Sequence, residues 1–60
     1  MKTIQDVKFG TILSAYGIQS VVVGLTDEGV LHKYQDGGEE FTSWTTLEYR
    51  LETRDTYIVR

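Results

Sequence analysis

The sequence predicts an all-β domain: a small barrel or a strongly bent antiparallel sheet of five to six strands, with a short helical turn near residues 46–52 as a variant. Thr, Val, Ile and the aromatic residues make up 25 of the 60 residues, a composition that favours strands over helices. The chain has no Pro that would remove a backbone donor from a strand. Turn-forming stretches near residues 16, 28 and 37 are spaced as in a meander or small barrel. We therefore expect residues 1–60 to form a single domain.

The strongest local signal is Asp36-Gly37-Gly38, which separates two β-prone runs at residues 30–35 and 40–46. Gly adopts positive φ without strain and Asp tolerates the left-handed region, as a tight hairpin turn requires. The sequence therefore predicts a β-hairpin between the third and fourth strands.

The first strand is predicted over residues 7–14, where side chains alternate. Gly10 inside it indicates a bulge or a sharp bend. Ala15-Tyr16-Gly17 is predicted to form the first turn. The residues expected to share the apolar face are Val7, Phe9, Thr11 and Leu13.

Residues 18–25 form the most apolar run and predict the second strand, followed by a turn at residues 26–29. Apolar side chains occur on both of its faces, which indicates a central strand or a strand whose outer face meets a partner. One face is expected to carry Val21, Val23 and Leu25, and the other Ile18, Val22 and Gly24.

Residues 47–52 fit two patterns. Leu47, Tyr49 and Leu51 alternate with charged residues as in a strand. Thr45 and Glu48 also fit a helix capping box, with Leu47 and Leu51 on one helical face. We favour extended structure here, followed by a turn at residues 53–55 and a last strand over residues 56–60.

Composition limits the classes of function. The net charge is -3 with a pI near 4.8, and the six basic residues are scattered, which argues against a dominant phosphate-neutralising role. Without Cys there is no disulfide or thiolate metal site, and one His cannot form a His-based site alone. No apolar run exceeds the three residues 21–23, and the N-terminus lacks the apolar core of a signal peptide. We expect a cytoplasmic protein with no membrane partner.

Three segments of the chain follow a strand, strand, strand-turn-strand pattern. They are Gly10-Thr11-Ile12-Leu13, Val21-Val22-Val23-Gly24 and Val30-Leu31-His32-Lys33-Tyr34-Gln35-Asp36-Gly37, followed by Glu40-Phe41. Over residues 7–47 this pattern resembles an SH3-like small β-barrel of the Tudor or KOW type. The resemblance implies a small barrel in which two loops build an aromatic cage for a ligand.

A candidate binding site follows from strand direction, because the first turn and the Asp36–Glu40 region are expected at the same end of the barrel. Aromatic faces beside carboxylates suit a cation. The alternative is that the aromatic residues pack in the core or at its rim and the acids are solvated turn residues. The aromatic candidates are Tyr16, Tyr34 and Phe41, and the acidic candidates are Asp36, Glu39 and Glu40.

Trp44 and Phe41 cannot both point inward from a regular strand, so one of them is expected outside unless a bulge intervenes. An exposed aromatic of this size marks an interface, and Trp44 is therefore a further binding candidate. His32 is isolated and is expected to be a satisfied or surface histidine. The sequence contains no nucleophile motif, phosphate loop or metal-ligand spacing, so we predict no catalytic residue, metal or cofactor.

These observations favour a non-enzymatic acidic interaction module that binds a protein and regulates or inhibits it, as a bacterial or phage accessory protein would. A nucleic-acid-binding barrel that uses the C-terminal Arg residues is the first alternative. The second is a homo-oligomeric enzyme with a site at a shared axis, with Lys33 and Tyr34 as its first candidates. Because a domain this small has a limited core, self-association is also expected, through Val22 on the outer face of the second strand or Ile58 on the last one.

Overall fold

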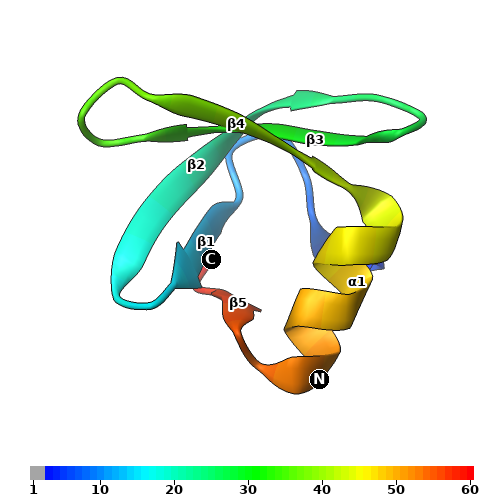
Figure 1. Cartoon of the computed structure of the whole chain (residues 1–60). Coiled ribbons are helices and arrows are strands. Elements are labelled where there is room, and N and C mark those ends of the chain that lie inside the picture. Colours follow the sequence, from blue (N-terminus) through cyan, green and yellow to red (C-terminus); the bar gives the residue numbers. More distant parts are fainter. Residues whose placement is uncertain (1–2) are drawn as a thin grey trace.

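The computed structural model describes residues 3–60, which form five antiparallel strands in one sheet, one α-helix and one 3-10 helix. The sheet is strongly bent but not closed into a barrel (Figure 1). In sequence order the elements are η1 (Ile4–Asp6), β1 (Ile12–Ala15), β2 (Ile18–Leu25), β3 (Gly29–Tyr34), β4 (Glu39–Ser43), α1 (Trp44–Thr53) and β5 (Thr56–Ile58).

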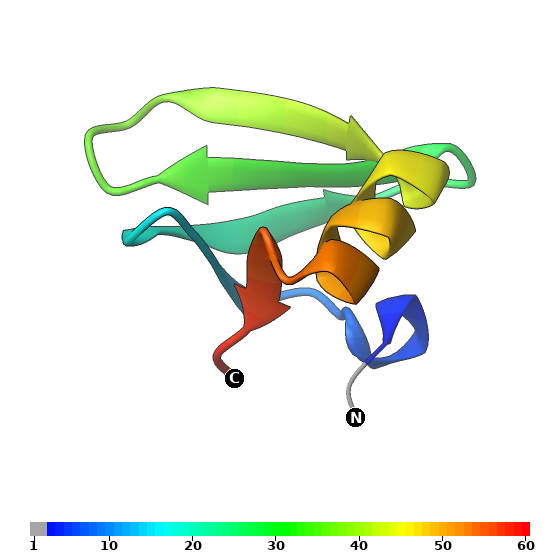
Figure 2. The same ribbon diagram turned by 60° about the horizontal axis from the view of Figure 1, so that its bottom comes forward.

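The strand order is β4-β3-β2-β1-β5, so β2 to β4 extend the meander and the last strand returns to the first. β5 pairs antiparallel with β1. The pairing continues beyond the last residue of β5, where Val59 N donates to Ile12 O at 2.8 Å. Helix α1 crosses from the end of β4 to the start of β5 (Figure 2). No helix within residues 3–60 is long and apolar enough to cross a bilayer.

The three turns predicted between consecutive strands are confirmed, and two of them contain residues with positive φ. Tyr16 and Gly17 have φ of 55° and 79°, which is the two-residue turn that follows the twist of its strands. At the other turn Gly37 has φ of 95°, and the Asp36 carboxylate accepts the Gly38 amide at 2.9 Å. Glycine is needed at residue 37 because a side chain at this φ is strained.

The bulge predicted at Gly10 is confirmed, but the strand around it is shorter than expected. Gly10 N donates to Val22 O, and Val22 N donates to Thr11 O, both at 2.8 Å. Gly10 and Thr11 together therefore lie opposite the single residue Val22, which defines a β-bulge. Gly10 has φ of 90°, and Lys8 N donates to Thr11 Oγ1 across a tight turn. The segment before β1 therefore turns instead of pairing, and Phe9, expected on the apolar face, is 73% exposed.

The preference for a strand over residues 47–52 is wrong, because α1 extends from Trp44 to Thr53. Its N-cap is Ser43, whose hydroxyl accepts from Thr46 N at 3.3 Å, so the cap lies two residues before the predicted Thr45. The helix ends at Arg54 in the left-handed conformation. Helical spacing turns Leu47 into the core, where it is 1% exposed, with Leu51 one turn further.

The core lies between the concave face of the sheet, α1 and the N-terminal segment. Val22, at 0% exposed, faces the core, so its predicted place on an outer face is wrong. Alternation holds up to this residue, because Ser20 and Val22 are both buried while Val21 between them is exposed. Both faces of the strand carry apolar side chains, so alternation alone does not decide which face is buried. Ile58 is half-buried and packs against the same core. The buried apolar residues are Val7, Leu13, Val22, Val30 and Leu47.

Candidate functional site

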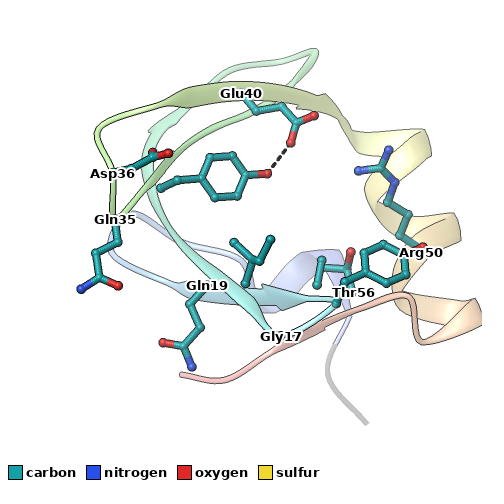
Figure 3. Close-up of a pocket in the computed structure, with 11 residues that line it drawn as sticks. Gly17, Gln19, Gln35, Asp36, Glu40, Arg50 and Thr56 are labelled. Carbon is teal, nitrogen blue, oxygen red and sulfur yellow. Dashed lines mark hydrogen bonds between the residues drawn. The ribbon is translucent and has the colours of Figure 1, made fainter.

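An open cleft of about 860 Å³ lies at the end of the sheet where the β1–β2 and β3–β4 turns meet (Figure 3). The meander places these turns together, because alternate turns of consecutive antiparallel strands fall at the same end. Helix α1 and the start of β5 complete its wall. The lining residues are Ala15, Tyr16, Gly17, Ile18, Gln19, Tyr34, Gln35, Asp36, Glu40, Arg50 and Thr56.

Four of the seven predicted binding residues line this cleft: Tyr16, Tyr34, Asp36 and Glu40. Tyr16 projects from the first turn and is 83% exposed, held there by its positive φ. Tyr34 is half-buried at the end of β3. The structure thus brings two aromatic rings and two carboxylates to one concave surface, as the strand directions predicted.

Tyr34 and Glu40 form the best-defined contact in the cleft. The Tyr34 hydroxyl donates to Glu40 Oε1 at 2.5 Å, drawn as a dashed line in Figure 3. This hydrogen bond to the carboxylate, with burial as a smaller cause, raises the pKa of Tyr34 above its usual value. The phenol therefore remains a donor at neutral pH, and its hydrogen bond holds the Glu40 side chain at the cleft wall.

Below the cleft lies a polar network around His32, which is 5% exposed. Ser20 Oγ lies 3.0 Å from His32 Nδ1, and Thr42 Oγ1 lies 2.8 Å from Nε2, so both ring nitrogens have a partner. Glu40 Oε1 lies further away, 3.8 Å from Nε2. Of the two predicted alternatives, a satisfied or a surface histidine, His32 is the satisfied one. Its ring packs edge-on against Tyr34, with centroids 5.6 Å apart, and so supports one wall of the cleft.

Burial lowers the pKa of His32 below 6.5, and the Arg50 charge acts in the same direction, while Glu40 opposes it. In a neutral imidazole one nitrogen donates and the other accepts, and a hydroxyl can serve either role. The Ser20 and Thr42 hydroxyls therefore satisfy the uncharged ring. Protonation would turn both ring nitrogens into donors in a nearly dry site.

We expect stability to fall with acidification as a result. The unfolded protein takes up a proton at His32 near pH 6.5 and the folded protein only at lower pH. The contribution of His32 to the free energy of unfolding is therefore fully present above about pH 6.5. It is lost progressively as the pH falls from there toward the pKa of His32 in the folded protein. Urea unfolding at pH 7.5, 6.5 and 5.5 measures this, and His32→Gln should flatten the profile in that window. Because the sequence has one His, an NMR titration of its ring gives the folded pKa directly, and a value above 6.5 would contradict this account.

Arg50 is the cleft residue that the sequence analysis missed. It lies on α1, and the segment was expected to be a strand, where no argument would place residue 50 beside the two hairpin turns. Figure 3 shows its side chain on the side of the cleft opposite Asp36 and Gln35. Within residues 3–60 its guanidinium takes part in no salt bridge or side-chain hydrogen bond.

The other three predicted binding residues lie elsewhere. Glu39 and Phe41 are exposed on β4, with Phe41 50% exposed on the convex face opposite Leu31. Trp44 starts α1 and is the inward member of the Phe41/Trp44 pair: it packs against the core, and its indole Nε1 donates to Thr26 O at 2.8 Å. Trp44 therefore serves as a structural tie between α1 and the β2–β3 turn.

No group of His, Asp and Glu side chains in the described part of the molecule is arranged to hold a metal ion. Comparisons with protein-family models, with curated proteins and with solved structures gave no match to this sequence.

Proposed function

We propose that this protein is a non-enzymatic interaction module that binds a protein partner, and thereby regulates or inhibits it, by receiving a basic side chain in the cleft. The observation that carries the proposal is the convergence of Tyr16, Tyr34, Asp36 and Glu40 on one concave surface. Aromatic rings attract a cation through their quadrupoles, and carboxylates pair with its charge. The net charge of -3 also favours the approach of a basic partner.

We further propose that this open, strongly bent sheet is an incomplete barrel of the SH3-like Tudor or KOW type. Five short antiparallel strands, the glycine bulge before β1 and the meeting of two turns at one end support this assignment. In a fold of this kind the turns supply the ligand contacts while the sheet holds them in place.

The proposal is tested with a minimal cationic probe, N-acetyl-lysinamide, in an NMR titration of the backbone amides. We expect shifts at Tyr16, Tyr34 and Asp36. Combining Asp36→Asn with Glu40→Gln should weaken binding about tenfold, because two exposed charge contacts contribute roughly 0.2–1 kcal/mol each. Glu39→Gln is the matched control, since this carboxylate is outside the cleft lining, and it should leave the affinity unchanged.

Shifts spread over the whole surface, or equal binding by the double variant, would contradict the proposed site. A duplex DNA or RNA oligonucleotide is titrated in parallel. Tight binding with a steep salt dependence would instead support the nucleic-acid-binding alternative, because phosphate contacts release counterions.

A further inference from the structure

The cleft carries charges of both signs on separate elements. Asp36 and Glu40 belong to the β3–β4 hairpin, whereas Arg50 belongs to α1 on the opposite side (Figure 3). Glu40 already accepts the Tyr34 hydroxyl. The guanidinium of Arg50 has no acceptor among side chains of the described residues, although it presents five N–H donors in a planar fork.

Arg50 is close enough to influence groups both in the cleft wall and beneath it. Its positive charge acts on both His32 and Tyr34. It also borders a smaller cavity of about 30 Å³, beneath the cleft, together with His32, Tyr34 and Glu40. A cation entering the cleft beside Tyr34 and Glu40 therefore meets the repulsion of Arg50 as well as the attraction of the carboxylates.

This repulsion disappears if the ligand brings its own anion. A carboxylate matches the guanidinium fork and accepts two parallel hydrogen bonds from it. We propose that the cleft binds an amphoteric segment of its partner, in which a basic side chain lies against Tyr16, Tyr34 and Asp36 while a carboxylate pairs with Arg50. This inference rests on the proposed function and adds the second charge that the ligand must carry.

The carboxylate has two sources, the free C-terminus of the partner or an acidic side chain next to the basic residue. Three probes separate them: N-acetyl-lysine with its free carboxylate, N-acetyl-lysinamide without one, and the blocked dipeptide N-acetyl-Asp-Lys-amide. Acetate alone serves as the fourth probe. We expect a carboxylate-bearing lysine probe to bind about fivefold to tenfold more tightly than N-acetyl-lysinamide. A preference for N-acetyl-lysine indicates a C-terminus, and a preference for the dipeptide indicates an acidic side chain.

Substitution of Arg50 gives the decisive comparison. Arg50→Gln should weaken the carboxylate-bearing probe and strengthen N-acetyl-lysinamide, because it removes an attraction from one and a repulsion from the other. Arg50→Lys should retain part of the carboxylate preference. Lys33→Gln is the matched control, since it removes an exposed positive charge from β3 outside the cleft and should change neither affinity. Circular dichroism establishes that each variant is folded.

The outcomes distinguish this inference from the proposed function. If N-acetyl-lysinamide binds in the cleft and Arg50→Gln changes neither affinity, the carboxylate site is wrong and the cation site stands. If acetate binds with the same affinity as N-acetyl-lysine, the anion site stands alone and the cation site is wrong. If no probe shifts the cleft residues, both are wrong.

Discussion

Val22→Lys should leave this protein unfolded at 25 °C, whereas Val21→Lys should leave it folded. The two residues are adjacent on β2 but differ in environment: Val22 is 0% exposed and Val21 is 37% exposed. Val22 packs in the cluster that includes Leu13 and Val30. A lysine there must either bury its charge or be neutralised, which costs several kcal/mol. A core of this size supplies only about 3–5 kcal/mol in total.

Far-ultraviolet circular dichroism with urea titration measures the effect. A cooperative transition for Val22→Lys with a midpoint near that of the unmodified protein would show that this position is not in the core.

The same pair of variants tests self-association, which stays a prediction. Since Val22 is inside, the outer face of β2 must contribute through Val21, and sedimentation velocity should show fewer oligomers for Val21→Lys than for the unmodified protein. Without such a shift, that face is not the interface.

Gly29→Ala is the second substitution with a large expected effect. Gly29 begins β3 opposite Ser43, and the β4 backbone passes directly over it. An added Cβ would overlap the carbonyl oxygen of Thr42 and lie 2.7 Å from Ser43 Cα. Backbone atoms paired in a sheet cannot move aside without breaking the ladder, so the strand end and the start of α1 must shift. We expect a fall in melting temperature of about 10–20 °C, since each kcal/mol is worth about 4–8 °C in a domain of this size.

Gly24→Ala is the control. Gly24 lies in the neighbouring strand, and its added Cβ would be 3.4 Å from Leu31 Cβ, an ordinary contact. The melting temperature of this variant should change by only about 2–4 °C. Thermal unfolding of both variants decides the matter. A similar fall in melting temperature for the two variants would mean that alanine destabilises the sheet through its strand propensity and not through the close backbone approach at Gly29.

The parts of the fold that the sequence predicts are those fixed by local backbone chemistry. The turns at Tyr16-Gly17 and at Gly37 require positive φ, and the bulge at Gly10 requires it too, so glycine marks their places. Strand direction then brings Tyr16, Tyr34, Asp36 and Glu40 together without knowledge of side-chain packing. Turn chemistry thus located most of the cleft.

The missed parts depend on tertiary packing. Leu47 and Leu51 are four residues apart, a spacing that fits one face of either a strand or a helix, and only the core decides between the two. The wrong choice hid Arg50, because its place beside the hairpin turns exists only when the segment is helical. Likewise, Val21 and Val22 lie on opposite faces of β2 as alternation requires, but both faces carry apolar side chains, and only the packing of the core decides which face is buried.

The position of α1 has a consequence for how the domain opens. This helix contacts β4 at one edge of the sheet and β5 at the other, and it also contacts η1. Neither edge strand can separate from the sheet without disturbing the helix that the other edge packs against. The two ends of a meander would otherwise fray independently. Here the helix joins them into one cooperative unit, so the backbone amides of β4 and β5 should exchange with solvent in a single shared opening and not in two.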